Sequence, residues 1–182
     1  LLSVDKTGVS REVYYEPTIN SVSSEYTSAA QTLRGHIQNA VEKRLISDVP
    51  LGAFLSGGID SSIIVGVLSE LTDDPVRTFT IGFGESQFDE TWAANAVAEY
   101  HDTDHHEYTV TPSDVREMIP TVIDSLGEPF ADSSILPTFI VARETRRDVK
   151  VAISGDGADE LFLGYNKYRG EYHSKYFRAL PR

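Results

Sequence analysis

Residues 51–62 read LGAFLSGGIDSS, and the rest of the chain can be interpreted around them. The first five residues, Leu51 to Leu55, are mostly apolar, which is typical of a short buried strand. Ser56-Gly57-Gly58 interrupts the apolar run where an amphipathic helical pattern begins. A turn between a strand and a helix directs backbone N–H groups and the positive end of the helix dipole at one point. The string therefore predicts an anion-binding site.

The residues of this loop suit a phosphate accompanied by a divalent cation. Gly57 and Gly58 lack a Cβ, so the backbone can adopt a positive φ and a phosphate can approach closely. Hydroxyl donors are added by Ser56, Ser61 and Ser62. A carboxylate at Asp60 would repel a phosphate unless Mg²⁺ stood between them. A simpler interpretation stays open, in which Ser61 or Asp60 only caps the helix.

Composition excludes several classes of protein. The 182 residues contain no cysteine, which rules out disulfides and cysteine metal sites. Acidic residues number 28 against 16 basic residues, so the surface should repel nucleic acid and anionic membranes, and we expect neither as a partner. No apolar run is long enough to span a bilayer and the start is no signal peptide. We expect a cytoplasmic protein.

Helical and extended patterns alternate after residue 20. Helical spacing covers 21–47, 59–73, 93–100, 136–147 and a segment that begins at Pro112, whereas extended patterns cover 51–55, 76–83, 106–110 and 149–153. We expect Ile63, Ile64, Val67, Leu68 and Leu71 to face inward on the second helix, and Val115, Met118, Ile119, Val122 and Ile123 on the fourth. The alternation predicts an α/β fold, a parallel sheet with flanking helices and a crevice at the carboxyl ends of its strands.

A second glycine-rich turn, SGDGADE at 154–160, follows the strand predicted at 149–153. If the two strands are neighbours, the two loops face one another across one crevice. Asp60 and Asp159 could then hold the same Mg²⁺, because hard cations combine carboxylate and phosphate oxygens. The alternative is that Asp159 and Glu160 are only an acidic first turn favoured by the helix dipole.

Two other polar clusters leave a choice of role. Adjacent histidines on a strand point to opposite faces, so His105-His106-Glu107 favours a structural role over a zinc site. Asp132 and Ser133, followed by Ser134, would suit recognition of an amino acid or, equally, a capping turn before the helix at 136.

The motifs together closely resemble the synthetase domain of the glutamine-hydrolysing asparagine synthetases. They are LSGGIDSS at 55–62, SGDGADELFLGY at 154–165, Phe88-Asp89-Glu90, His105-His106-Glu107 and Glu128-Pro129-Phe130-Ala131-Asp132. The resemblance covers nearly all of 21–182 and implies an ATP pyrophosphatase (PP-loop) domain, with an adenine nucleotide alpha hydrolase-like three-layer architecture. Residues 1–20 resemble the tail of the preceding glutaminase domain and a linker. We therefore expect a fragment that lacks the C-terminal part of the synthetase domain.

The resemblance implies a complete reaction. Aspartate is converted by ATP to β-aspartyl-AMP, which ammonia from glutamine attacks, releasing asparagine, AMP and pyrophosphate. The implied cofactors are ATP and Mg²⁺, and the implied partners are aspartate, ammonia and the glutaminase domain of the same chain. A homodimer is one assembly to consider.

The resemblance also assigns roles to individual residues. Contacts to ATP fall to Leu55, Ser56, Gly57, Gly58, Asp60, Ser61, Ser62, Ile81, Ser154 and Gly155. Mg²⁺ is assigned to Asp60 and Asp159, catalysis to Asp60 and Asp156, and the amino-acid substrate to Asp132, Ser133 and Asp159. The lysine that neutralises pyrophosphate in the family comes after Arg182.

Two positions depart from the family pattern. Asp156 stands where many members carry Glu, and its shorter side chain limits its reach as a general base for ammonia. Leu163 replaces a usual Gly, which we expect to alter helix packing only. Two other functions therefore stay open: the same chemistry on another carboxylate, in an amidotransferase or a cyclase, and a non-catalytic nucleotide-binding module.

Overall fold

The computed structural model describes residues 1–18, 24–84 and 91–178. Backbone contacts divide the chain into two units, residues 1–34 and residues 35–182. The first unit contains an antiparallel hairpin of β1 (Leu2–Asp5) and β2 (Gly8–Arg11) and the start of α1 (Tyr26–Glu42). In the turn between the two strands, Asp5 Oδ1 accepts hydrogen bonds from the N–H groups of Thr7 and Gly8.

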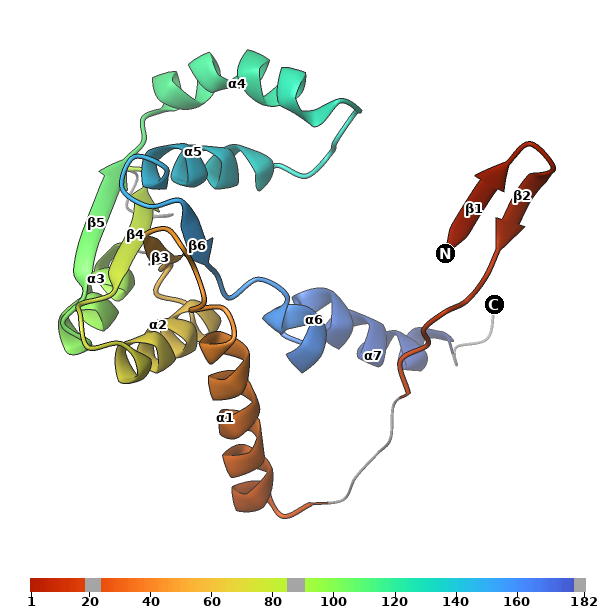
Figure 1. The fold of residues 1–182 in the computed structure, drawn as a ribbon, viewed down its shortest axis with the longest axis horizontal. Helices are drawn as coiled ribbons and strands as arrows, with labels where there is room; N and C mark the ends of the chain where they lie inside the picture. The colour runs from red at the N-terminus through yellow and green to blue at the C-terminus, as the bar shows by residue number, and fades with distance from the viewer. Residues whose placement is uncertain (19–23, 85–90, 179–182) are drawn as a thin grey trace. The chain divides into compact units, whose positions relative to one another are not determined.

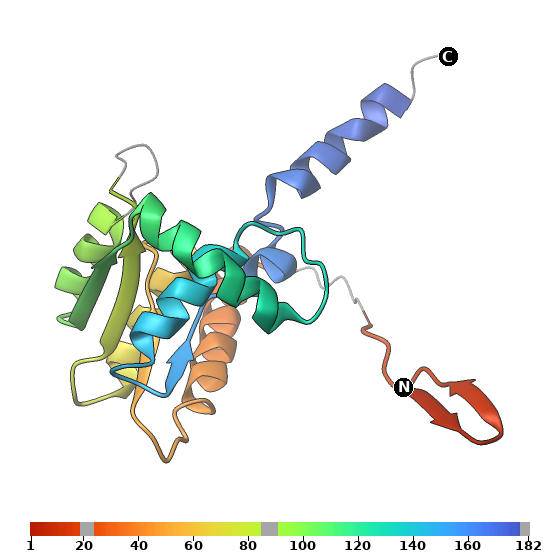
Figure 2. The same cartoon turned by 90° about the horizontal axis from the view of Figure 1, so that it is seen from above.

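The second unit is built on a parallel sheet of four strands in the order β5-β4-β3-β6. The strands are β3 (Leu51–Phe54), β4 (Arg77–Gly82), β5 (Asp104–Thr109) and β6 (Val151–Ile153). The helices α2 (Ile59–Leu71) and α3 (Thr91–Tyr100) lie on one face, and α4 (Pro112–Leu126) and α5 (Ile135–Thr145) on the other (Figures 1 and 2). The expected three-layer α/β fold is confirmed.

The order of the strands creates a reversal between β3 and β6. The chain passes from β3 outward to β4 and β5, and then returns to the other side of β3 to form β6. Right-handed crossovers in opposite directions place helices on opposite faces and leave a crevice where the carboxyl ends of the two inner strands diverge. The chain continues from β6 into α6 (Ala158–Phe162) and α7 (Asn166–Arg178).

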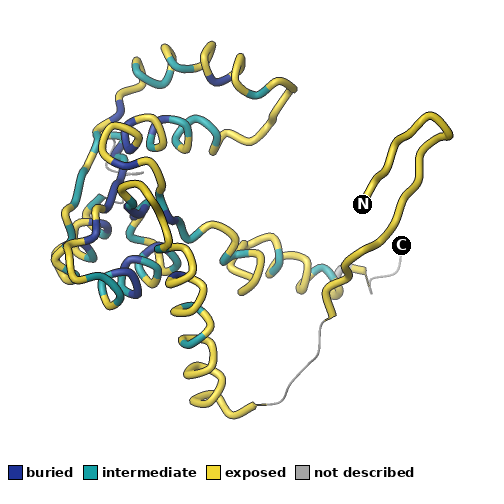
Figure 3. Tube along the Cα trace, in the orientation of Figure 1, coloured by how far each residue is buried: buried dark blue, intermediate teal, exposed yellow. Residues whose placement is uncertain are grey.

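The hydrophobic core lies between the sheet and α2. Ala53, Leu55, Val65 and Leu68 are almost fully buried, and Figure 3 shows buried residues concentrated along β3, β4 and α2. None of the helices among the described residues combines the length and the apolar character needed to cross a membrane.

Three of the residues expected to face inward do not, namely Ile63, Ile119 and Ile123. On α2 the buried positions are Ser61, Val65, Val67 and Leu68. Ile63 lies two positions from both Ser61 and Val65, which places it about 200° around the helix from each. On α4 only Val122 is buried, so its apolar face is narrower than the sequence pattern predicted.

Candidate active site

A cleft of about 460 Å³ lies at the carboxyl ends of β3, β4 and β6. The two glycine-rich loops and α5 complete its walls. Of the residues predicted to contact ATP, those that line it are Leu55, Ser56, Asp60, Ser61, Ile81, Ser154 and Gly155. Gly57, Gly58 and Ser62 belong to the first loop but are not among the residues lining the cleft. The structure thus brings two distant segments of the sequence to one place.

The first loop presents an uncapped helix N-terminus. The N-cap of α2 is Gly58, and no side chain caps its first N–H groups. The simpler interpretation, in which Ser61 or Asp60 caps this helix, is therefore wrong. The first backbone N–H groups of an α-helix have no partner within the helix, and a ligand can satisfy them. The geometry suits an anion at this position.

The serine hydroxyls shape the loop from within. Ser61 Oγ, which is buried, accepts a hydrogen bond from the N–H of Ser56 at 3.3 Å and donates one to the carbonyl of Gly58 at 3.2 Å. Ser62 Oγ donates to the same carbonyl at 2.6 Å. These bonds tie the turn between β3 and α2 to the first turn of the helix.

The two glycines of this loop differ in their backbone. Gly57 has a φ of +76°, and a Cβ there would lie 2.5 Å from the backbone N of Ala94 in α3. Both the conformation and the space therefore require glycine. The positive φ expected of Gly58 is wrong, because its φ is −68° in the extended N-cap conformation.

The second loop packs directly against the first. β3 and β6 are paired neighbours, so the condition set for a shared crevice is met. A Cβ on Gly155 would lie 2.9 Å from the backbone N of Ser61 and 3.0 Å from the Cβ of Asp60. This close approach of Gly155 to the first turn of α2 brings the carboxylates of both loops into the same cleft.

Three carboxylates line the cleft: Asp60, Asp156 and Asp159. Ser154 Oγ donates a hydrogen bond to Asp156 Oδ2 at 2.9 Å, which orients that carboxylate. Asp159 lies in the first turn of α6, and its Oδ1 is so close to Gly164 that a Cβ there would be 1.8 Å away. Among the described residues there is no group of three or more His, Cys, Asp or Glu arranged to hold a metal.

Sequence reasoning missed several residues of the cleft. Phe79 on β4 and Phe83 just after β4 flank Ile81 at two-residue spacing, and Pro137, Thr138 and Val141 come from α5. The period of two along β4 could have identified the phenylalanines once Ile81 was placed. No comparable signal marks the residues of α5 or Tyr165, which lines the cleft just before α7.

Two predicted substrate residues lie elsewhere. Asp132 and Ser133 are not among the residues lining the cleft. Asp132 Oδ1 accepts a hydrogen bond from the N–H of Ser134 at 2.9 Å, and this contact lowers the pKa of the Asp132 carboxyl below its ordinary value. The carboxylate of Asp132 is thus hydrogen-bonded within the turn before α5. Phe88-Asp89-Glu90 falls outside the described residues.

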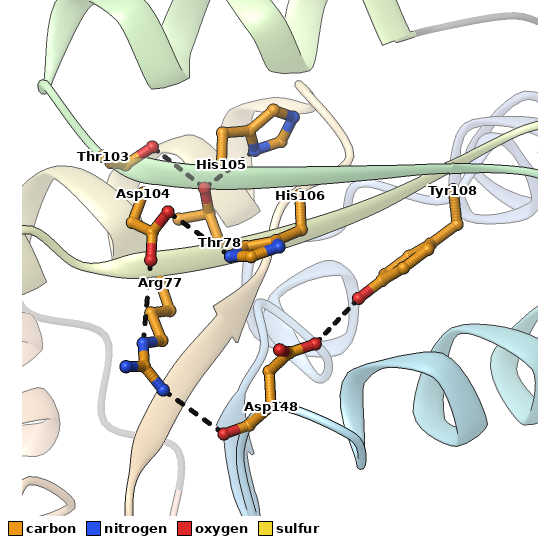
Figure 4. A network of polar contacts seen from close by, with 8 residues as sticks. All are labelled: Arg77, Thr78, Thr103, Asp104, His105, His106, Tyr108 and Asp148. Carbon is orange, nitrogen blue, oxygen red and sulfur yellow. Dashed lines mark hydrogen bonds and ion pairs between the residues drawn. The ribbon is translucent and has the colours of Figure 1, made fainter.

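The histidines of β5 belong to a polar network outside the cleft (Figure 4). His105 and His106 leave the strand in opposite directions, as expected: the first pairs with Thr78 Oγ1 at 2.8 Å and the second stacks on Phe79. Burial lowers the pKa of His105. Nearby, Tyr108 donates to Asp148 Oδ2 at 3.0 Å, and burial together with this bond raises the pKa of Tyr108 to about 12. These contacts join β4 and β5 to the segment before β6.

The asparagine synthase family model matches residues 32–182. The chain belongs to the asparagine synthase family. It is 44% identical over 147 residues to a Methanocaldococcus jannaschii protein provisionally named glutamine-hydrolyzing asparagine synthetase 2, covering 80% of this chain and 28% of that protein. It is 35% identical over 170 residues to glutamine-hydrolyzing asparagine synthetase 1 of Bacillus subtilis, covering 93% and 27%. The chain therefore spans little more than a quarter of the length of these asparagine synthase relatives.

Among solved structures, NMN synthetase from Francisella tularensis aligns with 79% of this chain and 59% of its own, at a TM-score of 0.49 and 16% sequence identity. The three-layer architecture of this asparagine synthase family member is established by its own sheet order and flanking helices.

The structure explains one departure from the asparagine synthase family pattern. Leu163 ends α6 with a φ of 60° and a ψ of 36°, the left-handed conformation that favours glycine. Its side chain is 67% exposed. Leu163 therefore occupies a backbone conformation that a glycine would adopt at lower cost.

Proposed function

We propose that the full-length protein synthesises asparagine from aspartate and ATP, through a β-aspartyl-AMP that is attacked by ammonia derived from glutamine. Membership of the asparagine synthase family supports the reaction, and the names of the relatives support glutamine as the nitrogen source. The products are asparagine, AMP and pyrophosphate. The N-terminal glutaminase domain expected from the sequence supplies the ammonia.

The observation that carries the proposal is the meeting of two glycine-rich loops at the reversal between β3 and β6. The uncapped N-terminus of α2 opens at this point, and Gly155 of the second loop approaches it closely. In α/β proteins a ligand binds at such a reversal, and a helix N-terminus binds phosphate. ATP combines a phosphate chain for the loops with a base for the apolar wall formed by Leu55, Phe79 and Ile81.

The chemistry of the carboxylates suits Mg²⁺. Asp60 and Asp159 come from separate loops and both line the cleft, and Mg²⁺ in nucleotide sites takes one or two carboxylates with phosphate oxygens and water. When bound, Mg²⁺ would offset charge on the leaving pyrophosphate.

The residues of this chain would then position the reactants. The N–H groups of α2 hold the phosphates against the strand ends, and Ser154 fixes the carboxylate of Asp156 through Oδ2. Its second oxygen, Oδ1, is left to accept a proton from the attacking ammonia. The side chain of Asp156 is one methylene shorter than that of glutamate. The close packing of the two loops therefore has to bring the acyl group of β-aspartyl-AMP toward the Asp156 carboxylate.

The test is pyrophosphate release by the full-length protein with Mg-ATP and L-aspartate, or with a panel of other carboxylates. Wild type should release pyrophosphate only with aspartate, and Asp60→Asn should abolish release. The matched control is Asp73→Asn, which removes an exposed carboxylate just beyond the other end of α2 and should behave as wild type.

The other outcomes are equally informative. Release with a different carboxylate would refute aspartate as the substrate and indicate an amidotransferase or a cyclase. ATP binding without release, with any acceptor, would refute catalysis and leave a nucleotide-binding module.

A further inference from the structure

The cleft carries an excess of negative charge. Among its described lining residues Asp60, Asp156 and Asp159 are acidic, and none is lysine, arginine or histidine. A bound nucleotide would add the charges of its phosphates, and Mg²⁺ offsets only two of them. Coulomb repulsion between these groups grows in a site shielded from water. A cation at the rim would therefore strengthen binding.

The ring of Tyr165 contacts a cation, the ammonium of Lys167. It lines the cleft beside Asp159, and its hydroxyl donates a hydrogen bond to Glu160 Oε1 at 2.8 Å, which fixes the ring. The Nζ of Lys167, in the first turn of α7, lies 4.4 Å from the centre of this ring. The same ammonium is 5.5 Å from the ring of Tyr168. Lys167 thus contacts a residue that lines the cleft.

The described residues form no ion pair with Lys167. Within the part of the chain that the structure describes, its ammonium pairs with no carboxylate and is held by the two aromatic rings. A cation over an aromatic ring at an exposed site is held weakly, whereas a charge-assisted hydrogen bond to phosphate is stronger. The long, flexible side chain can therefore leave the ring for an anion in the cleft.

We propose that Lys167 binds the phosphate groups of the nucleotide held in the cleft, with Tyr165 as the platform that keeps its ammonium at the rim. This inference rests on the proposed function for the identity of the ligand. It adds a cation within the described chain to the lysine that the family resemblance places after Arg182. Because the contact forms with the bound nucleotide rather than only during the reaction, it should act on the KM for ATP and little on kcat.

The test compares Lys167→Met with Lys175→Met in the full-length protein. Lys175 lies on the same helix, with its Nζ 3.7 Å from the ring centre of Tyr172, a residue that is not among those lining the cleft. Both substitutions remove one charge and two cation–π contacts. The measurements are the affinity for Mg-ATP by calorimetry, the KM and kcat of pyrophosphate release, and the thermal unfolding temperature.

Lys167→Met should weaken Mg-ATP binding and raise the KM about tenfold, the effect of one exposed charge-assisted contact. The value of kcat should stay within about twofold, and Lys167→Arg should recover most of the affinity because it keeps the charge. Lys175→Met should match wild type. Equal affinities for the two methionine variants would overturn the proposal. If the wild type binds ATP but releases no pyrophosphate, the proposed function fails, and weaker binding by Lys167→Met would still support this inference.

Discussion

Gly164→Ala should displace the carboxylate of Asp159 while the protein stays folded. A Cβ at residue 164 would lie 1.8 Å from Asp159 Oδ1, whereas carbon–oxygen contacts normally fall near about 3.3–3.6 Å. The φ of Gly164 is not in the left-handed region, so alanine can adopt this backbone. The carboxylate of Asp159 therefore has to move by about 1.5 Å, given that contact distance.

A displacement of this size is costly at a reacting centre. A misplacement of about 1 Å can lower a rate about 100-fold. At about 1.36 kcal/mol for each factor of ten, this corresponds to about 2.7 kcal/mol of lost transition-state stabilisation. Because Asp159 is proposed to hold Mg²⁺, the variant should also need more Mg²⁺ to reach its maximal rate.

The assay is pyrophosphate release at saturating ATP across a range of Mg²⁺ concentrations, together with thermal unfolding. The matched control is Gly170→Ala in α7, where a Cβ meets nothing within 4 Å. The control should keep wild-type activity and gain up to about 1 kcal/mol of stability, since alanine favours a helix. A folded Gly164→Ala protein with the wild-type rate and Mg²⁺ dependence would refute the role given to Asp159.

Two other substitutions test features of the fold. Leu163→Gly should stabilise the protein by about 0.5–1 kcal/mol, because relief of the left-handed strain exceeds the entropy cost of glycine. Urea unfolding would measure the change in the free energy of unfolding, and a loss of stability would contradict the prediction. Burial lowers the pKa of His105 in the folded state, so the unfolded chain binds the proton more readily than the folded one. The stability that the neutral His105 contributes is therefore complete above about pH 6.5 and is lost as the pH falls below that value. His105→Gln should therefore flatten the acid side of a stability profile between about pH 7 and 5, whereas the exposed His36→Gln should not, and identical profiles for the two variants would exclude this role of His105.

The elements of the fold follow from local patterns in the sequence. The strand at Leu51–Phe54 and the helix at Ile59–Leu71 were both predicted, because short apolar runs and helical spacing are properties of neighbouring residues. The antiparallel hairpin at the start has the same local origin, because the turn residues Asp5 to Gly8 are neighbours in the chain. Exposure was less predictable: Ile63 and Ile123 are apolar residues of amphipathic helices whose buried side depends on what packs there.

The glycine loops also show where local reasoning ends. The sequence predicted a loop at Ser56–Gly58 and a second at Ser154–Gly157, and a shared crevice only on the condition that their strands are neighbours. That they share one cleft depends on the pairing of β3 with β6, which are separated in the chain by two other strands and four helices. Strand order is set by long-range packing, and a single sequence carries no direct record of it.

By itself, the sequence determined the α/β class, the two glycine motifs and membership of a family, because each depends on residues that are close in the chain. Only the tertiary structure decided which residues surround the cleft, such as Phe79 from β4 and Val141 from α5. It also showed that Asp159 lies against Gly164 and that Lys167 stands over Tyr165. The contacts around the cleft arise when helices pack on a sheet, and the free energy of that packing depends on surfaces far apart in sequence, whereas the last two contacts join residues that are close in the chain.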